Sequence, residues 1–363
     1  MNGECPRCRE YAEEGQPFCG VCGRQLTDAA DDMEREPAVC GNDPDEGISK
    51  PVSAQRRMIE TFLLAACVAV MAIAVFEAIV LAINIPDIFS FLSGMFFRFF
   101  LLLPGTPVVF SLRDLALQMY WLFVAIVILL CVALTIKKFI CAIRSAESTD
   151  KFRAAENTAA FWVFILLTVS LLISYIIIYT VLLTGNDITT PSFGGKRMMM
   201  YLFAEAAFRE ELVTRVLFIG VPMVILSLII TKKKESFKCL LGGFEMSIAA
   251  FVLIMISAAI FGLAHYSGWD GQEWKVLQTG VMGVSLGYVF VRFGLYASIL
   301  LHFIVNYLSA FDWIGAGTFS GIVEWLLVGI GVVALIYMVM RLSDFKRSNA
   351  SLPLFGNRHT DER

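Results

Sequence analysis

Four charged residues lie within seven positions of an otherwise apolar region. The segment FREELVTRVLF contains Arg209, Glu210, Glu211 and Arg215, and an apolar run follows it. A charge at the centre of a membrane helix costs roughly 2.5–3.5 kcal/mol, so these side chains should pair or face water. On a helix, Glu211 and Arg215 lie one turn apart and can form an ion pair, as can Glu205 and Arg209. Glu210 is then the carboxylate left over, free to point at something else in the bundle.

Two histidines lie in other apolar segments. His265 is in FGLAHY and His302 is in LHFIVNY, whereas the third histidine, His359, is in the polar C-terminal tail. His302 and Asn306 are four residues apart and face the same way on a helix. A lone membrane histidine is as well explained by a polar contact between helices as by catalysis, but two of them with a leftover glutamate form a constellation.

These side chains together can hydrolyse a peptide bond. Glu210 would take a proton from a water molecule that His265 helps to hold, a general-base effect of about 10²–10⁴-fold. His302 and Asn306 would donate to the oxyanion, worth about 2.7–4 kcal/mol per donor. Glu210, His265 and His302 would equally make a catalytic zinc site with an open position for water. The HExxH motif is absent, so such a site would draw its ligands from three helices, and the residues leave both schemes open.

Two C-x-x-C pairs lie near the N-terminus. Cys5 and Cys8 form the first pair, and Cys19 and Cys22 form the second. Four thiolates on two such turns complete a tetrahedral zinc site, so residues 1–26 are predicted to be a structural zinc ribbon. Disulfides or unligated thiols are the alternatives, and a cytoplasmic location disfavours the disulfides. The ribbon shows no catalytic position, and we expect it to bind a protein partner or to regulate.

The elements that position the central residues are expected to be membrane helices. The chain of 363 residues is 58% hydrophobic and 17% charged, which is more apolar than soluble domains. About eight runs can cross the hydrocarbon core as helices. They are residues 59–83, 115–136, 161–183, 212–230, 248–263, 276–291, 295–308 and 322–340. The run at 295–308 suffices only if its helix begins near Arg292, and residues 86–103 are expected to be interfacial or re-entrant.

The predicted fold is an all-α polytopic membrane protein with a small N-terminal module. Residues 27–55 are polar and acidic and predict a disordered linker. The helical bundle is expected at residues 56–345 and a cytoplasmic tail at residues 346–363. Lysine and arginine concentrate before the first run, after the second and fourth, and after the last, which predicts a multi-pass cell-membrane protein with both termini in the cytoplasm. Nothing indicates nucleic-acid binding.

Three motifs follow one another along the apolar part of the chain. They are E-E-x-x-x-R at Glu210, Glu211 and Arg215, F-x-x-x-H at Phe261 and His265, and H-x-x-x-N at His302 and Asn306. Their order resembles the CPBP family, which comprises CAAX prenyl endopeptidases and bacteriocin-processing or Abi-type membrane proteases. The resemblance covers about residues 198–310, and the zinc ribbon lies outside the usual family core.

The resemblance implies roles for the motif residues. Glu210 would activate water with His265, and His302 with Asn306 would stabilise the oxyanion. Glu211 and its ion-pair partner would support the site. Family members are commonly described as metal-dependent, while a glutamate mechanism without metal is also proposed, so the resemblance leaves a catalytic divalent metal undecided.

The function expected from these residues is an intramembrane endopeptidase that cleaves a peptide or protein at the lipid bilayer. A proton- or ion-coupled transporter is one alternative, because buried Glu and His also mark ion paths, but no internal repeat is found. A catalytically idle scaffold or immunity protein with a partner-binding ribbon is another. A simpler reading of the charged stretch is that it marks the edge of the bilayer, in a helix that begins near Arg197.

Overall fold

The computed structural model describes residues 54–103, 106–147, 150–189, 194–231 and 234–347. Within these ranges, seven helices are long and apolar enough to span a membrane. They are α2 (Ala54–Phe91), α3 (Asp114–Ser145), α5 (Ala159–Leu183), the continuous stretch α6 (Lys196–Glu211), η1 (Leu212–Gly220) and α7 (Val221–Thr231), α8 (Ile248–Gly268), α9 (Glu273–Phe293) and α12 (Gly317–Arg347). The helical, multi-pass character expected from the sequence is confirmed.

The remaining described elements are short. The helices among them are α4 (Lys151–Glu156), η2 (Lys234–Leu241), α10 (Leu295–Tyr307) and α11 (Ala310–Trp313), and the strands are β1 (Phe96–Leu103) and β2 (Thr106–Arg113). The predicted zinc ribbon and nearly all of the predicted linker and tail lie outside the described residues.

The eighth predicted span is a short internal helix. Gly294 separates α9 from α10 with a φ of 104°, which residues with a side chain rarely adopt, so no helix runs from Arg292 into α10. The 13 residues of α10 extend about 20 Å, less than the hydrocarbon thickness of roughly 30 Å. The helix contacts α2, α3, α5, α6 and α9, and this packing buries most of its side chains. It therefore carries His302 into the interior of the helical unit.

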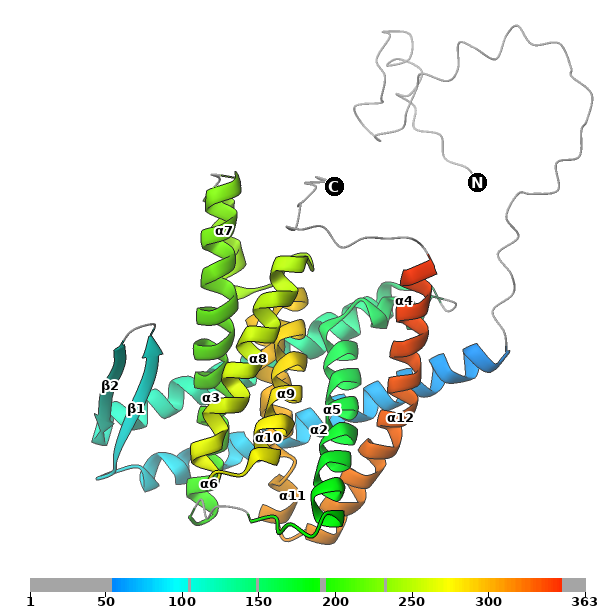
Figure 1. Cartoon of the computed structure of the whole chain (residues 1–363). Coiled ribbons are helices and arrows are strands. Elements are labelled where there is room, and N and C mark those ends of the chain that lie inside the picture. Colours follow the sequence, from blue (N-terminus) through cyan, green and yellow to red (C-terminus); the bar gives the residue numbers. More distant parts are fainter. Residues whose placement is uncertain (1–53, 104–105, 148–149, 190–193, 232–233, 348–363) are drawn as a thin grey trace, which may run out of the picture. The chain divides into compact units, whose positions relative to one another are not determined.

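One hairpin interrupts the helical architecture. Strands β1 and β2 pair antiparallel with Phe99 opposite Phe110, between the end of α2 and the start of α3 (Figure 1). This hairpin was not expected from the sequence, although its Phe and Val content favours strands. Helix α2 continues through Pro86 to Phe91, so the first part of the segment expected to be interfacial or re-entrant belongs to this helix. Asn84 donates its side-chain amide to the Val80 carbonyl at 2.7 Å in the turn before the proline.

The charged stretch lies inside a helix that begins at Lys196, well before residue 212, where the sequence placed the start of this span. The second half of the stretch, with Arg215, lies in η1, which has the wider π-helical turn, and the Val221 N–H bonds to the Val216 carbonyl five residues back. Pro222 follows and explains this turn, because proline has no N–H and its ring would clash with the carbonyl four residues before it. The charges therefore occupy the interior of the helix, not its first turn.

Glycines bring α8 and α9 close together, and these helices run side by side (Figure 1). A Cβ atom on Gly262 would meet the Val276 carbonyl oxygen at 2.6 Å, and one on Gly283 would lie 2.9 Å from the Ala258 Cα. Small residues allow this close approach between membrane helices. The contact fixes the position of α8, which carries His265.

We expect Gly262→Val to destabilise the fold, because the added side chain must push α8 away from α9. Overpacking of this kind typically costs about 1–3 kcal/mol, and thermal unfolding in detergent measures it. Gly280→Ala is the matched control on the same interface, since a Cβ there would find its nearest neighbour, the Ala258 oxygen, at an ordinary 3.9 Å. Equal losses of stability in both variants would contradict this account of the α8–α9 contact.

Candidate active site

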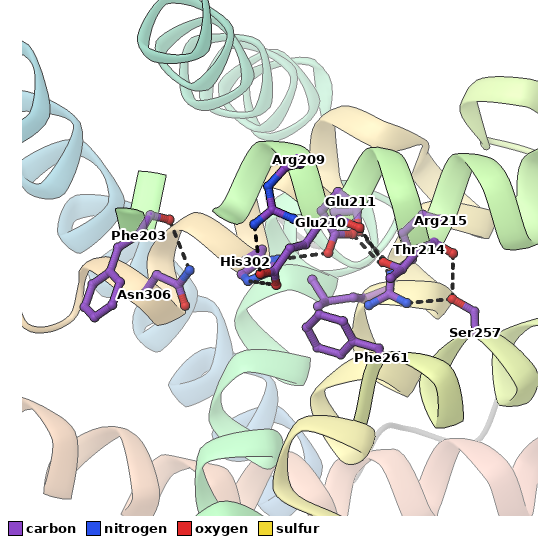
Figure 2. Close-up of polar contacts among 12 residues, drawn as sticks. Phe203, Arg209, Glu210, Glu211, Thr214, Arg215, Ser257, Phe261, His302 and Asn306 are labelled. Carbon is purple, nitrogen blue, oxygen red and sulfur yellow. Dashed lines mark hydrogen bonds and ion pairs between the residues drawn. The ribbon is translucent and has the colours of Figure 1, made fainter. Parts of the chain in front are cut away.

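A buried ion pair lies at the centre of the charged stretch. Arg215 Nε is 3.2 Å from Glu211 Oε2, and both side chains are fully buried, which confirms the pair expected from their spacing (Figure 2). Arg215 Nη1 donates to Ser257 Oγ on α8 at 2.7 Å, and that hydroxyl donates to the Thr214 carbonyl at 2.7 Å. The guanidinium carbon also lies 5.0 Å from the centroid of the Phe261 ring, a cation–π contact. The pair thus joins α6 and η1 to α8.

The same carboxylate holds α10. Glu211 Oε1 is 2.9 Å from His302 Nδ1, and the Ser298 hydroxyl donates to Glu211 Oε2. A carboxylate only accepts hydrogen bonds when ionised, so Nδ1 carries the hydrogen and Nε2 of His302 is left to face the cavity. Neither Ser257 nor Ser298 was expected from the sequence to belong to the site. Ser298 had a usable signal, because it precedes His302 by four residues and shares its helix face.

Glu210 points at both intramembrane histidines. Its Oε2 lies 3.9 Å from His265 Nε2 and 3.8 Å from His302 Nε2. These distances are too long for direct hydrogen bonds but leave room for a bridging water molecule. His265 Nδ1 is 2.9 Å from the Phe261 carbonyl oxygen, which can only accept, so this nitrogen carries the hydrogen and Nε2 is directed to Glu210. As its place on the helix predicts, Glu210 does not pair with Arg215 and points towards the two histidines.

Arg209 lies between two carboxylates. Its Nε is 2.6 Å from Glu205 Oε1, as the spacing predicts, and its Nη2 is 3.7 Å from Glu210 Oε1. Tyr120 on α3 donates its hydroxyl to Glu205 Oε1 at 3.1 Å. One oxygen of Glu210 therefore faces a guanidinium while the other faces the two imidazoles.

Asn306 lies on the same side of α10 as His302 but makes a different contact from the one expected. Its Nδ2 donates to the Phe203 carbonyl at 3.1 Å, one turn away from the histidine (Figure 2). The side chain still lines the cavity that contains Glu210 and both histidines. One amide hydrogen is thus committed to the backbone, and the other remains for a ligand.

A cavity of about 880 Å³ contains these groups. Its volume is within the range of roughly 300–1,000 Å³ that is usual for ligand pockets. Glu210, His265, His302 and Asn306 line it, whereas Glu211 and its arginine lie behind the wall. The lining also includes charged residues that the sequence analysis did not assign to the site, namely Glu205, Arg209, Lys275 and Glu324.

The structure describes only one of the two predicted metal sites. The four cysteines of the ribbon lie outside the described residues. Among the residues that the structure describes, no group of three or more His, Cys, Asp or Glu side chains is arranged to hold a metal ion. Glu210 nevertheless lies close to both His265 and His302, at 3.9 Å and 3.8 Å between the nearest carboxylate oxygen and ring nitrogens.

We expect Glu211→Ala to destabilise the protein by about 3–5 kcal/mol, because Arg215 would be left as a buried charge without its carboxylate. Thermal unfolding in detergent measures the effect. The double variant Glu211→Ala/Arg215→Met removes both charges and should regain most of the lost stability. A single variant as stable as the unmodified protein would show that the pair contributes little.

The comparisons with known proteins agree with this geometry. Residues 195–308 match the family model described as Type II CAAX prenyl endopeptidase Rce1-like. The matched stretch runs from the start of α6 to the end of α10 and includes all the motif residues discussed above. Searches of curated proteins and of solved structures gave no match. The chain therefore contains a domain of the Rce1-like CAAX prenyl endopeptidase (CPBP) family, that is, the domain of an intramembrane protease.

Proposed function

We propose that Glu210 is the general base that activates water for attack on a peptide carbonyl. The observation that carries the proposal is the approach of Glu210 Oε2 to the Nε2 atoms of His265 and His302, at 3.9 Å and 3.8 Å. Both imidazoles are anchored through Nδ1, so neither can turn its Nε2 away without losing a hydrogen bond. A protease that uses water as its nucleophile needs such a fixed place for one water molecule.

The hydrogen-bonding capacity of water fits this place. Glu210 Oε2 accepts one hydrogen bond, and neutral His265 accepts another at Nε2. A water molecule that donates to both keeps an oxygen lone pair free for the carbonyl carbon. Glu210 takes a proton as the C–O bond forms and passes it to the amine nitrogen as the C–N bond breaks.

The oxyanion that forms on attack needs hydrogen-bond donors. His302 donates from Nε2 when protonated, and in that state Glu211 forms an ion pair with it at Nδ1, at 2.9 Å. Asn306 has one amide hydrogen beyond the one given to Phe203. We assign these two donors to the oxyanion, and the buried arginine behind Glu211 to holding that carboxylate in place.

The substrate class that suits the cavity is a peptide or protein segment at the membrane. Apolar side chains form much of the wall, among them Leu171, Ile178, Leu202, Val213 and Met282. The reactive carboxylate and imidazoles occupy one region of that wall. An apolar peptide segment that enters from the bilayer can therefore bring its backbone to Glu210 while its side chains remain in apolar surroundings.

We expect Glu210→Gln to lower peptide cleavage by at least 10²-fold, because an amide cannot take the proton of the attacking water. The substrate is found first, by quantifying peptide termini in cells that produce the unmodified protein or the variant. Cleavage of that peptide by purified protein then gives the rate. Glu77→Gln is the control: Glu77 is a buried acid of α2 that has no hydrogen-bond partner among the described residues and lies outside the cavity. Full activity in Glu210→Gln would reject the assignment.

We also propose that Cys5, Cys8, Cys19 and Cys22 hold a structural zinc ion and that this module binds a protein partner. The module and the C-terminal tail are both proposed to lie on the cytoplasmic side. The purified chain is then expected to hold one zinc ion per molecule, and Cys5→Ser/Cys8→Ser is expected to hold none while it keeps its proteolytic activity. Elemental analysis and a chelator titration measure this. A second ion that persists in the cysteine variant and is lost in His265→Ala would instead make Glu210, His265 and His302 metal ligands.

A further inference from the structure

Lys275 differs from the other charged residues that line the catalytic cavity. Arg209 has a carboxylate partner, and Glu324 accepts a hydrogen bond from the Tyr175 hydroxyl at 2.6 Å. Lys275, on α9, forms no ion pair with any Asp or Glu that the structure describes. It is a cation of the cavity wall whose charge the fold does not neutralise by contact.

The ammonium group is nevertheless held in place. Lys275 Nζ donates to Gln278 Oε1 at 2.8 Å and lies 3.8 Å from the centroid of the Trp269 ring, with the Trp274 ring at 5.7 Å. Trp274 in turn donates to the Gln272 side chain. An ammonium group has three donors, and Gln278 takes one, so the others remain for a ligand. The position is fixed before any ligand arrives, which reduces the entropy cost of binding.

Lys275 lies in the same cavity as the residues proposed to carry out the reaction. Lys275 and Gln278 line the same cavity as Glu210 and His265. Lys275 lies in the first turn of α9, and no Asp or Glu among the described residues lies within ion-pair distance of it. A molecule that enters the cavity with a negative group would be attracted to this point while its backbone lies near the catalytic carboxylate.

We propose that Lys275 binds a carboxylate of the peptide substrate and so selects which peptides are cut. The inference rests on the proposed proteolytic function. A single ammonium matches the single charge of a carboxylate. A phosphate group is more often held by several basic groups or by a bidentate arginine, and Arg209, the other cation of the cavity wall in the described part of the chain, is already engaged by Glu205 and Glu210.

A binding experiment tests the proposal without requiring cleavage. The Glu210→Gln protein, in detergent, is incubated with a pool of apolar peptides that end in a free carboxylate, and with the same pool ending in an amide. A third, amidated pool carries one internal glutamate. Mass spectrometry of the retained peptides gives the affinities. We expect the carboxylate forms to bind on the order of 10- to 100-fold more tightly, the range for a hydrogen bond to a charged group. The free-carboxylate and glutamate pools show whether the end of the chain or a side chain is read.

The preference should disappear with the lysine. Adding Lys275→Met should reduce the binding of carboxylate peptides to the level of the amides and leave the amides unchanged, whereas Lys275→Arg should keep the preference. Lys138→Met is the matched control, because Lys138 also lies over an aromatic ring, that of Tyr296 at 4.3 Å, but outside the cavity.

Three results would overturn the proposal. Equal binding of carboxylate and amide pools would do so, as would an equal loss of both in Lys275→Met, which indicates a structural anchor. The lysine would be reassigned to a lipid phosphate if vesicles of phosphatidylglycerol abolish the preference for carboxylate peptides and the retention of that lipid depends on Lys275. If carboxylate peptides bind through Lys275 but the unmodified protein cuts none of them, the proposed function fails while the binding site stands.

Discussion

The buried contact between Glu211 and Arg215 organises the centre of the protease domain. Two fully buried charges in a membrane helix need to be paired and hydrogen-bonded. Among the described residues, Arg215 Nη2 is the buried nitrogen of this pair that has no hydrogen-bond partner. The partners of Glu211 come from η1 and from α10, and the partner of the guanidinium beyond this pair comes from α8. The need to satisfy one ion pair therefore fixes three chain segments together, and His302 acquires its orientation as part of that arrangement.

Two consecutive glutamates take different tasks because a helix turns about 100° per residue. Glu211 points into the packed interior and is completely buried, whereas Glu210 is 22% exposed and lines the cavity. Glu211 orients His302 through Nδ1, and Glu210 meets the other nitrogen of the same ring. Glu211 and Glu210 thus lie at the two nitrogens of the His302 ring. A substitution of Glu211 is therefore expected to move the imidazole that Glu210 faces.

Much of this arrangement was open to prediction, and the limits have physical causes. Hydropathy located the long helices, and the four-residue spacing identified both Glu–Arg pairs, because these features depend on local sequence alone. The meeting of Glu210 with two histidines from other helices could be expected only from the order of the motifs. Gly294, which shortens α10, is visible in the sequence as a glycine before the apolar run, but a hydropathy profile does not register it as a helix end. Lys275 and Ser257 had no such signal, since their importance depends on which helices pack together.

The central claim is that Glu210 activates water and does not itself attack the peptide. Single-turnover cleavage in water labelled with oxygen-18 tests this most directly, with mass spectrometry of both the product and the Glu210 peptide. The account predicts one heavy oxygen in the new carboxyl group of the product and none in the Glu210 side chain. Heavy oxygen in the Glu210 carboxyl group would reveal a covalent acyl intermediate and would contradict the account.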